Sequence, residues 1–181
     1  MFIKDFDKGC VLVVGGAKSG KSRFALDLCN DMNRSRIFLA TAQAKDSEMD
    51  ERIKRHQLER GNGWKTVEEP LNVAKSIREL ANEKTALLLD CLTLWVNNLY
   101  MAYEDDRAAI KDEMESLIEE LSKTKGIVVA VSNEVGSGIV PENALARIYR
   151  DDVGILNQRI AQISRKVVML IAGLPVVLKE E

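Results

Sequence analysis

The stretch VLVVGGAKSGKS, residues 11–22, decides the fold class of this chain. It opens with an apolar run typical of a buried β-strand, and from Gly15 to Ser22 it fits the phosphate-loop pattern G-x-x-x-x-G-K-[ST]. Glycines let such a loop curl so that backbone N–H groups point at phosphate oxygens. A helical pattern follows at once, and the positive end of that helix faces the same anion. This placement favours a phosphate loop over a glycine-rich turn that matches by chance.

Three polar side chains supply chemistry around this loop. Lys21 is predicted to place its ammonium group near the β and γ phosphates, and Ser22 to offer its hydroxyl to Mg²⁺. Asp90 ends the apolar run 86–89 and therefore lies at the sheet edge where α/β proteins bind ligands. It is predicted to hold Mg²⁺ directly or through water. The alternative is that Asp90 caps the helix that follows.

Outside the loop, short apolar runs alternate with longer amphipathic stretches. Strands buried on both faces are predicted at 11–14, 37–40, 86–89, 127–131 and 167–172, with an edge strand at 176–178. Helices are predicted at 21–32, 46–60, 71–81, 93–101, 106–123 and 142–166. This order indicates an α/β fold with a mostly parallel sheet flanked by helices. No repeat or linker interrupts it, so residues 1–181 are expected to form a single P-loop nucleotide-binding domain.

Composition excludes several other classes of protein. The chain has 26 Lys and Arg against 28 Asp and Glu, a balance that offers no basic surface for nucleic acid or an anionic membrane. The N-terminus lacks the apolar segment of a signal peptide, and Gly173 and Pro175 interrupt the longest apolar stretch. Three widely spaced cysteines indicate a reducing compartment. We therefore expect a cytoplasmic protein that binds neither membrane nor nucleic acid.

His56 is the single histidine of the chain. Met49 and Ile53 precede it at helical spacing, so one interpretation is a partly buried residue on a helix face. Arg52 and Arg60 lie four residues to either side, which favours a neutral imidazole beside a site for a triphosphate. Such an imidazole could act as a nucleophile or as a general base, and the residues alone do not decide between these roles.

The segment after the strand at 127–131 is rich in glycine. Glu134 follows that strand at the same predicted edge as Asp90, where it would be a metal-shell or base residue or part of a plain connection. Arg147 and Arg150 lie one turn apart on the next predicted helix. They would either reach phosphates or face solvent, and both interpretations stay open.

Several stretches together resemble the bifunctional adenosylcobinamide kinase / adenosylcobinamide-phosphate guanylyltransferases of cobalamin biosynthesis, over almost the whole chain. They are VLVVGGAKSGKSRFAL at 11–26, FLATAQAKDSEMDERIKRHQ at 38–57, W-x-T-x-E at 64–68, VSNEVGSGIVPENALARIYRD at 131–151 and NQRIA at 157–161. A phosphate loop alone would identify only a large superfamily. The run at 131–151 is far more specific.

The resemblance implies a RecA-like P-loop domain, a homotrimer and two activities. In the first, the γ-phosphate of ATP or GTP is transferred to the aminopropanol hydroxyl of adenosylcobinamide. In the second, a histidine attacks the α-phosphate of GTP, and GMP then passes to adenosylcobinamide phosphate to give adenosylcobinamide-GDP. The alternatives are a P-loop small-molecule kinase without guanylyl transfer, with a structural His56, or a non-catalytic GTP-dependent switch protein.

The family's functional positions carry over residue by residue. The guanylylated histidine matches His56, which with Lys21 makes the predicted catalytic pair, and Ser22 and Asp90 are the predicted Mg²⁺ ligands. The predicted nucleotide-binding residues are Gly15, Gly16, Ala17, Lys18, Ser19, Gly20, Lys21, Ser22, Thr41, Ala42, Gln43, Gln57, Leu58, Glu59, Arg60, Glu68 and Asp90.

The chain departs from the family pattern at three places. Arg55 stands where many members have a second histidine, and Asp90 stands where glutamate is common. The frequent Lys-Asp-Gly-Arg after the histidine reads Gln-Leu-Glu-Arg at 57–60, so that only Arg60 is retained. These changes are expected to affect the preference for a nucleobase and the reaction rate more than the class of reaction.

Overall fold

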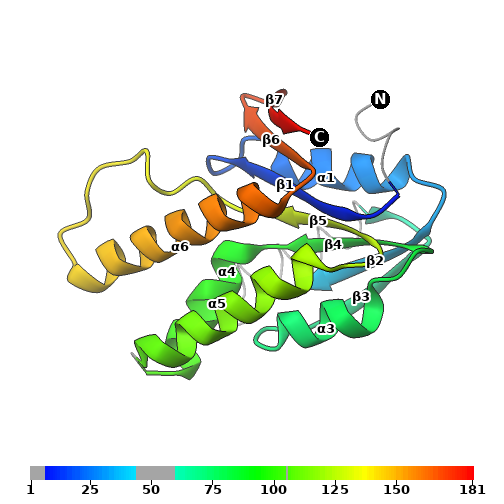
Figure 1. The fold of residues 1–181 in the computed structure, drawn as a ribbon. Helices are drawn as coiled ribbons and strands as arrows, with labels where there is room; N and C mark the ends of the chain where they lie inside the picture. The colour runs from blue at the N-terminus through cyan, green and yellow to red at the C-terminus, as the bar shows by residue number, and fades with distance from the viewer. Residues whose placement is uncertain (1–6, 44–59, 105) are drawn as a thin grey trace.

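The computed structural model describes residues 7–43, 60–104 and 106–181, which form one seven-stranded sheet (Figure 1). Neighbouring strands pair parallel except for the last pair, β6 and β7, which is antiparallel. The predicted mostly parallel sheet is therefore confirmed. Across the sheet the strands are β3 (Trp64–Glu68), β2 (Ser35–Ala40), β4 (Thr85–Asp90), β5 (Ile127–Val131), β1 (Gly9–Gly15), β6 (Lys166–Ile171) and β7 (Leu174–Glu180).

Helices cover both faces of this sheet, because its inner strands are apolar on both sides. In β1, Val11 and Val13 pack toward α1, whereas Leu12 points to the opposite face. Of the described helices, α1 (Lys21–Asn30) covers the first face, and four helices cover the second (Figure 1). These four are α3 (Val73–Leu80), α4 (Leu92–Ala102), α5 (Arg107–Ser122) and α6 (Ala144–Ile163).

Several elements differ from the sequence-based expectations. β3 was not predicted as a strand, because as an edge strand it is largely exposed and has no continuous apolar run. The helix predicted to reach residue 166 ends at Ile163, since the backbone turns extended at Ser164 and Arg165 donates to the carbonyl of Cys10 (2.9 Å). β7 confirms the predicted edge strand but begins earlier, at Leu174. The helix predicted at 46–60 lies, except for Arg60, outside the described residues.

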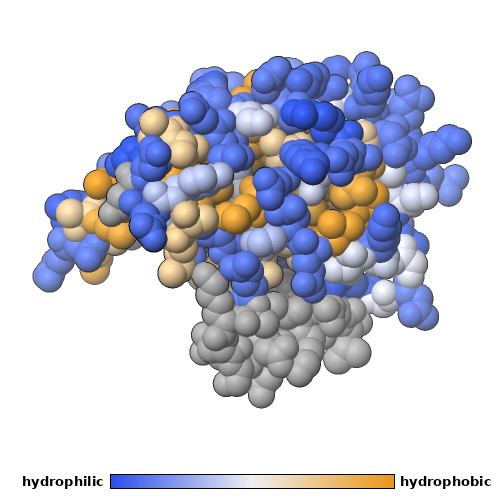
Figure 2. Space-filling view, turned by 90° about the horizontal axis from the view of Figure 1, so that it is seen from below, coloured by the Kyte–Doolittle hydropathy of each residue, from blue (hydrophilic) through white to orange (hydrophobic). Residues whose placement is uncertain are grey.

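No helix in the described ranges combines the length and the hydrophobicity needed to cross a membrane. Figure 2 shows the molecule from below, with hydrophilic side chains around smaller hydrophobic patches. Ile155 of α6 and Met101 of α4 are among the large apolar residues that stay exposed. Single exposed apolar residues of this kind are ordinary on a protein surface.

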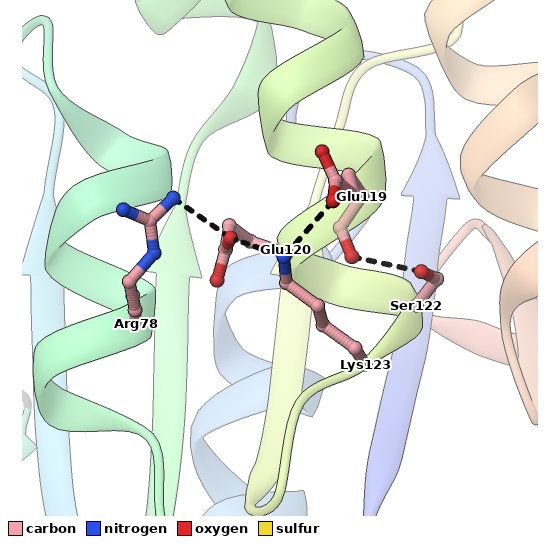
Figure 3. Close-up of polar contacts among 5 residues, drawn as sticks. All are labelled: Arg78, Glu119, Glu120, Ser122 and Lys123. Atoms are coloured by element: carbon pink, nitrogen blue, oxygen red, sulfur yellow. Dashed lines mark hydrogen bonds and ion pairs between the residues drawn. The ribbon is translucent and has the colours of Figure 1, made fainter.

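A buried carboxylate ties α5 to α3 (Figure 3). Glu120 is 4% exposed, and its Oε1 lies 2.8 Å from Nη2 of Arg78 and 2.9 Å from Nζ of Lys123. Lys123 also contacts the exposed Glu119 (3.0 Å). The hydrogen bond from Arg78, helped by Lys123, lowers the pKa of Glu120 below its ordinary 4.5, although burial opposes this shift.

We expect Glu120→Gln to lower the melting temperature at pH 7 by about 2–4 °C. Because the pKa of Glu120 is lower in the folded state, its charge stabilises the fold above pH 4.5, and this contribution disappears as pH falls through the folded pKa. The difference from wild type should therefore shrink in acid. Thermal unfolding from pH 3 to 7 measures it, with the exposed Glu119→Gln as control. Equal losses in both variants would contradict this role.

Candidate functional site

The phosphate loop follows β1 and turns into α1, as its sequence predicts. Gly20 adopts φ +97°, a left-handed conformation that favours glycine. At Gly15 a Cβ would lie 2.5 Å from the carbonyl oxygen of Leu170 in β6, so no side chain fits there. Lys21 is buried, and its Nζ donates to the carbonyl of Gly16 (2.5 Å) within the loop. The ammonium group thus lies inside the ring of backbone that would surround a phosphate.

The turn between β6 and β7 supports the loop from a distant part of the chain. The backbone N–H of Gly173 donates to the carbonyl of Ser19 (3.0 Å). A Cβ on Gly20 would lie 3.3 Å from the Cα of Gly173. Sequence reasoning did not anticipate this contact, because the two glycines are separated by most of the chain.

Asp90 ends β4 on the face of the sheet that α1 covers. Leu88, two residues earlier, packs in the same cluster as α1, and side chains two apart in a strand share a face. β5 separates β4 from β1, and Asp90 is level with Val131 at the end of β5. The alternative that Asp90 caps α4 is wrong, since the N-cap position is held by Cys91.

Arg60 and Glu68 lie on the same face of the sheet as Asp90. The guanidinium of Arg60 stacks over the ring of Phe38 (3.8 Å from Cζ to the centroid) and donates from Nη2 to Oγ1 of Thr66 (3.4 Å). Burial lowers the pKa of Arg60, and the negative charge of Asp90 opposes that shift. Glu68 is level with Ala40, which is level with Asp90. Glu68 and Asp90 therefore end the two strands that flank β2, and Arg60 stacks over a residue of β2 between them.

The segment after β2 is divided between buried and exposed residues. Thr41 is completely buried, and its hydroxyl donates to the carbonyl of Cys91 (2.8 Å). Ala42 is half-buried and Gln43 is exposed. The remaining predicted site residues, His56, Gln57, Leu58 and Glu59, lie outside the described residues.

Three charged residues of the 134–150 region have partners within the protein. A carboxylate oxygen of Glu134 accepts from the N–H of Gly136 (2.7 Å), which stabilises the turn. Arg147 donates to the carbonyls of Pro141 (2.9 Å) and Glu142 (2.6 Å), so its guanidinium holds the loop before α6. Arg150 lies 3.4 Å from the carboxylate of the exposed Asp151. The sequence left phosphate contact and exposure to solvent open for Arg147. The structure adds a third role, which is to hold the loop before α6.

A polar network that sequence reasoning missed joins this region to α4. The side-chain amide of Asn133 donates to Oγ1 of Thr93 (2.8 Å), and the amide of Asn157 donates to the carbonyl of Asn133 (3.1 Å). The hydroxyl of Tyr149 donates to the carbonyl of Thr93 (2.9 Å). Because Thr93 is at the start of α4, the network ties α6 to the end of β4 that carries the site.

The oxygen atoms near the loop suit a magnesium ion whose other ligands are phosphate oxygens of the nucleotide and water. Ser22 offers a hydroxyl and Asp90 a carboxylate, the hard oxygen ligands that Mg²⁺ prefers. Within the described ranges no group of three His, Cys, Asp or Glu residues could form an all-protein metal site. One or two protein oxygens beside substrate phosphates and water are the usual arrangement for Mg²⁺.

Comparison with known proteins agrees with this geometry. Residues 11–178 match the family model described as cobinamide kinase / cobinamide phosphate guanyltransferase. The bifunctional adenosylcobalamin biosynthesis protein CobP of Pseudomonas aeruginosa is 44% identical, over 94% of this chain and 97% of its own. The bifunctional adenosylcobalamin biosynthesis protein CobU of Escherichia coli K12 is 38% identical, over 93% of this chain and 99% of its own.

Solved structures confirm the P-loop, RecA-like fold alone. The RadB recombinase superposes with a TM-score of 0.52 at 12% identity, covering 89% of this chain and 73% of its own. A type III secretion ATPase gives a TM-score of 0.53 at 14% identity, covering 93% and 56%.

We expect Gly15→Ala to destabilise the fold by about 1–3 kcal/mol and to abolish nucleotide binding. The added methyl would collide with the carbonyl of Leu170 and push the loop out of shape. Gly16→Ala is the matched control for folding, because a Cβ there meets nothing within 4 Å. Urea unfolding and titration with a fluorescent GTP analogue measure the two effects. A Gly15→Ala protein as stable as Gly16→Ala would show that the close approach is not limiting.

Proposed function

Because this chain belongs to the cobinamide kinase / cobinamide phosphate guanyltransferase family, we propose that it performs both reactions of that family's description. It transfers the γ-phosphate of ATP or GTP to adenosylcobinamide, and it transfers GMP from GTP to adenosylcobinamide phosphate to form adenosylcobinamide-GDP. The observation that carries the proposal is the family match over 11–178, supported by the close packing at Gly15 and the contact of Lys21 with the carbonyl of Gly16. We further propose that residues 1–181 act as a single nucleotide-binding domain.

In the kinase reaction the phosphate loop positions the triphosphate. Backbone N–H groups between Gly15 and Ser22 and the N-terminus of α1 bind phosphate oxygens. Lys21 exchanges its contact with the carbonyl of Gly16 for the β and γ phosphates, where its charge stabilises the transferring group. Ser22 and Asp90 would hold Mg²⁺, which supplies further neutralisation of phosphate charge when bound. The acceptor oxygen bonds to the γ-phosphorus, the bond to the leaving nucleoside diphosphate breaks, and the hydroxyl proton is released to solvent.

In the guanylyl transfer, we propose His56 as the nucleophile. A ring nitrogen bonds to the α-phosphorus of GTP, and the bond to the β-phosphate oxygen breaks to release pyrophosphate. A phosphate oxygen of adenosylcobinamide phosphate then attacks the same phosphorus, and the phosphorus–nitrogen bond breaks. The described residues on either side of His56 in the sequence, Gln43 and Arg60, support the proposal. Gln43 follows the end of β2, and Arg60 lies close enough to Asp90 for their charges to interact.

We propose that the protein is a cytoplasmic homotrimer. All three cysteines are buried thiols that take no part in a disulfide, as suits a reducing compartment. The antiparallel edge of the sheet carries apolar residues that a neighbouring subunit would cover. They are Ile171, Leu174, Val176, Val177 and Leu178, each between 40% and 69% exposed.

Incubation with Mg²⁺ and GTP labelled at the α-phosphate should leave acid-labile, base-stable label on the denatured chain. His56→Ala should carry no label while still binding GTP, because the phosphate loop is unchanged. Since the chain has one histidine, a phosphoramidate on histidine identifies its position. A wild-type protein that binds GTP without becoming labelled would contradict guanylyl transfer. Phosphate transfer to adenosylcobinamide would then separate a kinase from a non-catalytic switch.

For the assembly, we expect light scattering after size-exclusion chromatography to give about three times the 20.2 kDa of one chain. Leu178→Asp should reduce this mass to that of a monomer, because a charge would be buried in the interface. Ile155→Asp, on the similarly exposed surface of α6, is the control and should leave the trimer intact. A monomeric wild type, or a trimer insensitive to Leu178→Asp, would contradict the proposed interface.

A further inference from the structure

Thr41 connects the end of β2 to the backbone that carries Asp90. Its N–H donates to the carbonyl of Asp90 (3.2 Å). Its hydroxyl accepts from the N–H of Cys91 (2.9 Å) and donates to the carbonyl of Cys91 (2.8 Å). One residue thus makes hydrogen bonds to both sides of the peptide bond that follows Asp90.

Thr41 is itself held in place from α4. The side-chain amide of Asn98, which is buried, donates to the carbonyl of Thr41 (2.8 Å) and to that of Pro70 (3.2 Å). The N–H, the carbonyl and the hydroxyl of Thr41 are therefore all engaged. A completely buried hydroxyl with this geometry has both a donor and an acceptor satisfied within the protein.

This arrangement differs from a direct nucleotide contact. To bind a ligand through its proton, the hydroxyl of Thr41 would have to give up its bond to the carbonyl of Cys91, which lies within the buried turn at the end of β4. The same bonds hold the backbone on both sides of the Asp90–Cys91 peptide, at the point where the chain leaves β4. They act over 50 residues of sequence and join two neighbouring strands at the ligand edge.

We propose that Thr41 is a positioning residue that holds Asp90 in the orientation needed for Mg²⁺–nucleotide binding. The proposal rests on the proposed function only through the role of Asp90 as a metal ligand. Groups that orient a metal ligand typically change metal affinity by about 10–100-fold when removed. The hydroxyl of Thr41 orients Asp90 through the backbone and contacts neither metal nor nucleotide.

The test compares Thr41→Val, which keeps the shape and removes the hydroxyl, with Thr41→Ser, which keeps the hydroxyl. The measurement is the ratio of GTP affinity in Mg²⁺ to GTP affinity in EDTA, obtained by calorimetry. We expect Thr41→Val to lower this ratio about 10-fold, with affinity in EDTA unchanged within about twofold. Thr41→Ser should restore the wild-type ratio. Should valine prevent folding, Thr41→Ala against Thr41→Ser makes the same comparison.

Thr85→Val is the matched control at the other end of β4. Thr85 is also buried, and its hydroxyl bonds to backbone groups of Asn82 (2.8 and 2.9 Å), far from the ligand edge. Thr85→Val should cost comparable stability and leave the ratio of GTP affinity in Mg²⁺ to GTP affinity in EDTA unchanged. A drop of equal size in Thr85→Val would overturn the proposal, because the effect would then be one of general stability.

Asp90→Asn separates this proposal from the function on which it rests. If Asp90→Asn lowers the ratio and Thr41→Val does not, the positioning role is wrong and the metal role of Asp90 stands. If Asp90→Asn leaves the ratio unchanged, the metal role is wrong and the positioning role falls with it. When both variants lower the ratio, the double variant should be no worse than Asp90→Asn alone, because Thr41 acts through Asp90.

Discussion

The site depends on the close approach of backbone to backbone at the end of β1. Between Gly15 and β6 there is no room for a Cβ, and Gly20 meets Gly173 from the turn between β6 and β7. The phosphate loop is therefore shaped from two sides, by its own glycines and by a hairpin near the other end of the chain. This packing leaves Lys21 buried inside the loop, where its ammonium can meet phosphate oxygens instead of water.

The parallel sheet collects the remaining polar groups around that loop. Because parallel strands end at the same edge, Asp90, Glu68 and the segment after β5 meet there, although each comes from a different part of the chain. The twofold alternation of side chains then selects the face. Asp90 and Leu88 are two residues apart in β4 and therefore share a face, and Leu88 packs on the face that α1 covers.

Several polar residues at this edge serve the scaffold. Arg147 holds the loop before α6, Glu134 stabilises its own turn, and Thr41 bonds to the backbone of Cys91. Their residue types alone would suit ligand binding equally well. Their partners distinguish the two uses, since each of these three side chains hydrogen-bonds to protein backbone.

The sequence by itself determined the fold class, the phosphate loop and most strands and helices, because these depend on local patterns of apolar residues and on glycines at fixed spacing. It also placed Asp90 at the ligand edge, since a carboxylate that ends an apolar run has few other positions in such a sheet. Only the tertiary structure decided that β3 joins the sheet, that Gly173 supports the loop, and that Thr41 bonds to Cys91. These features consist of contacts between residues far apart in sequence, whose partners no local pattern specifies.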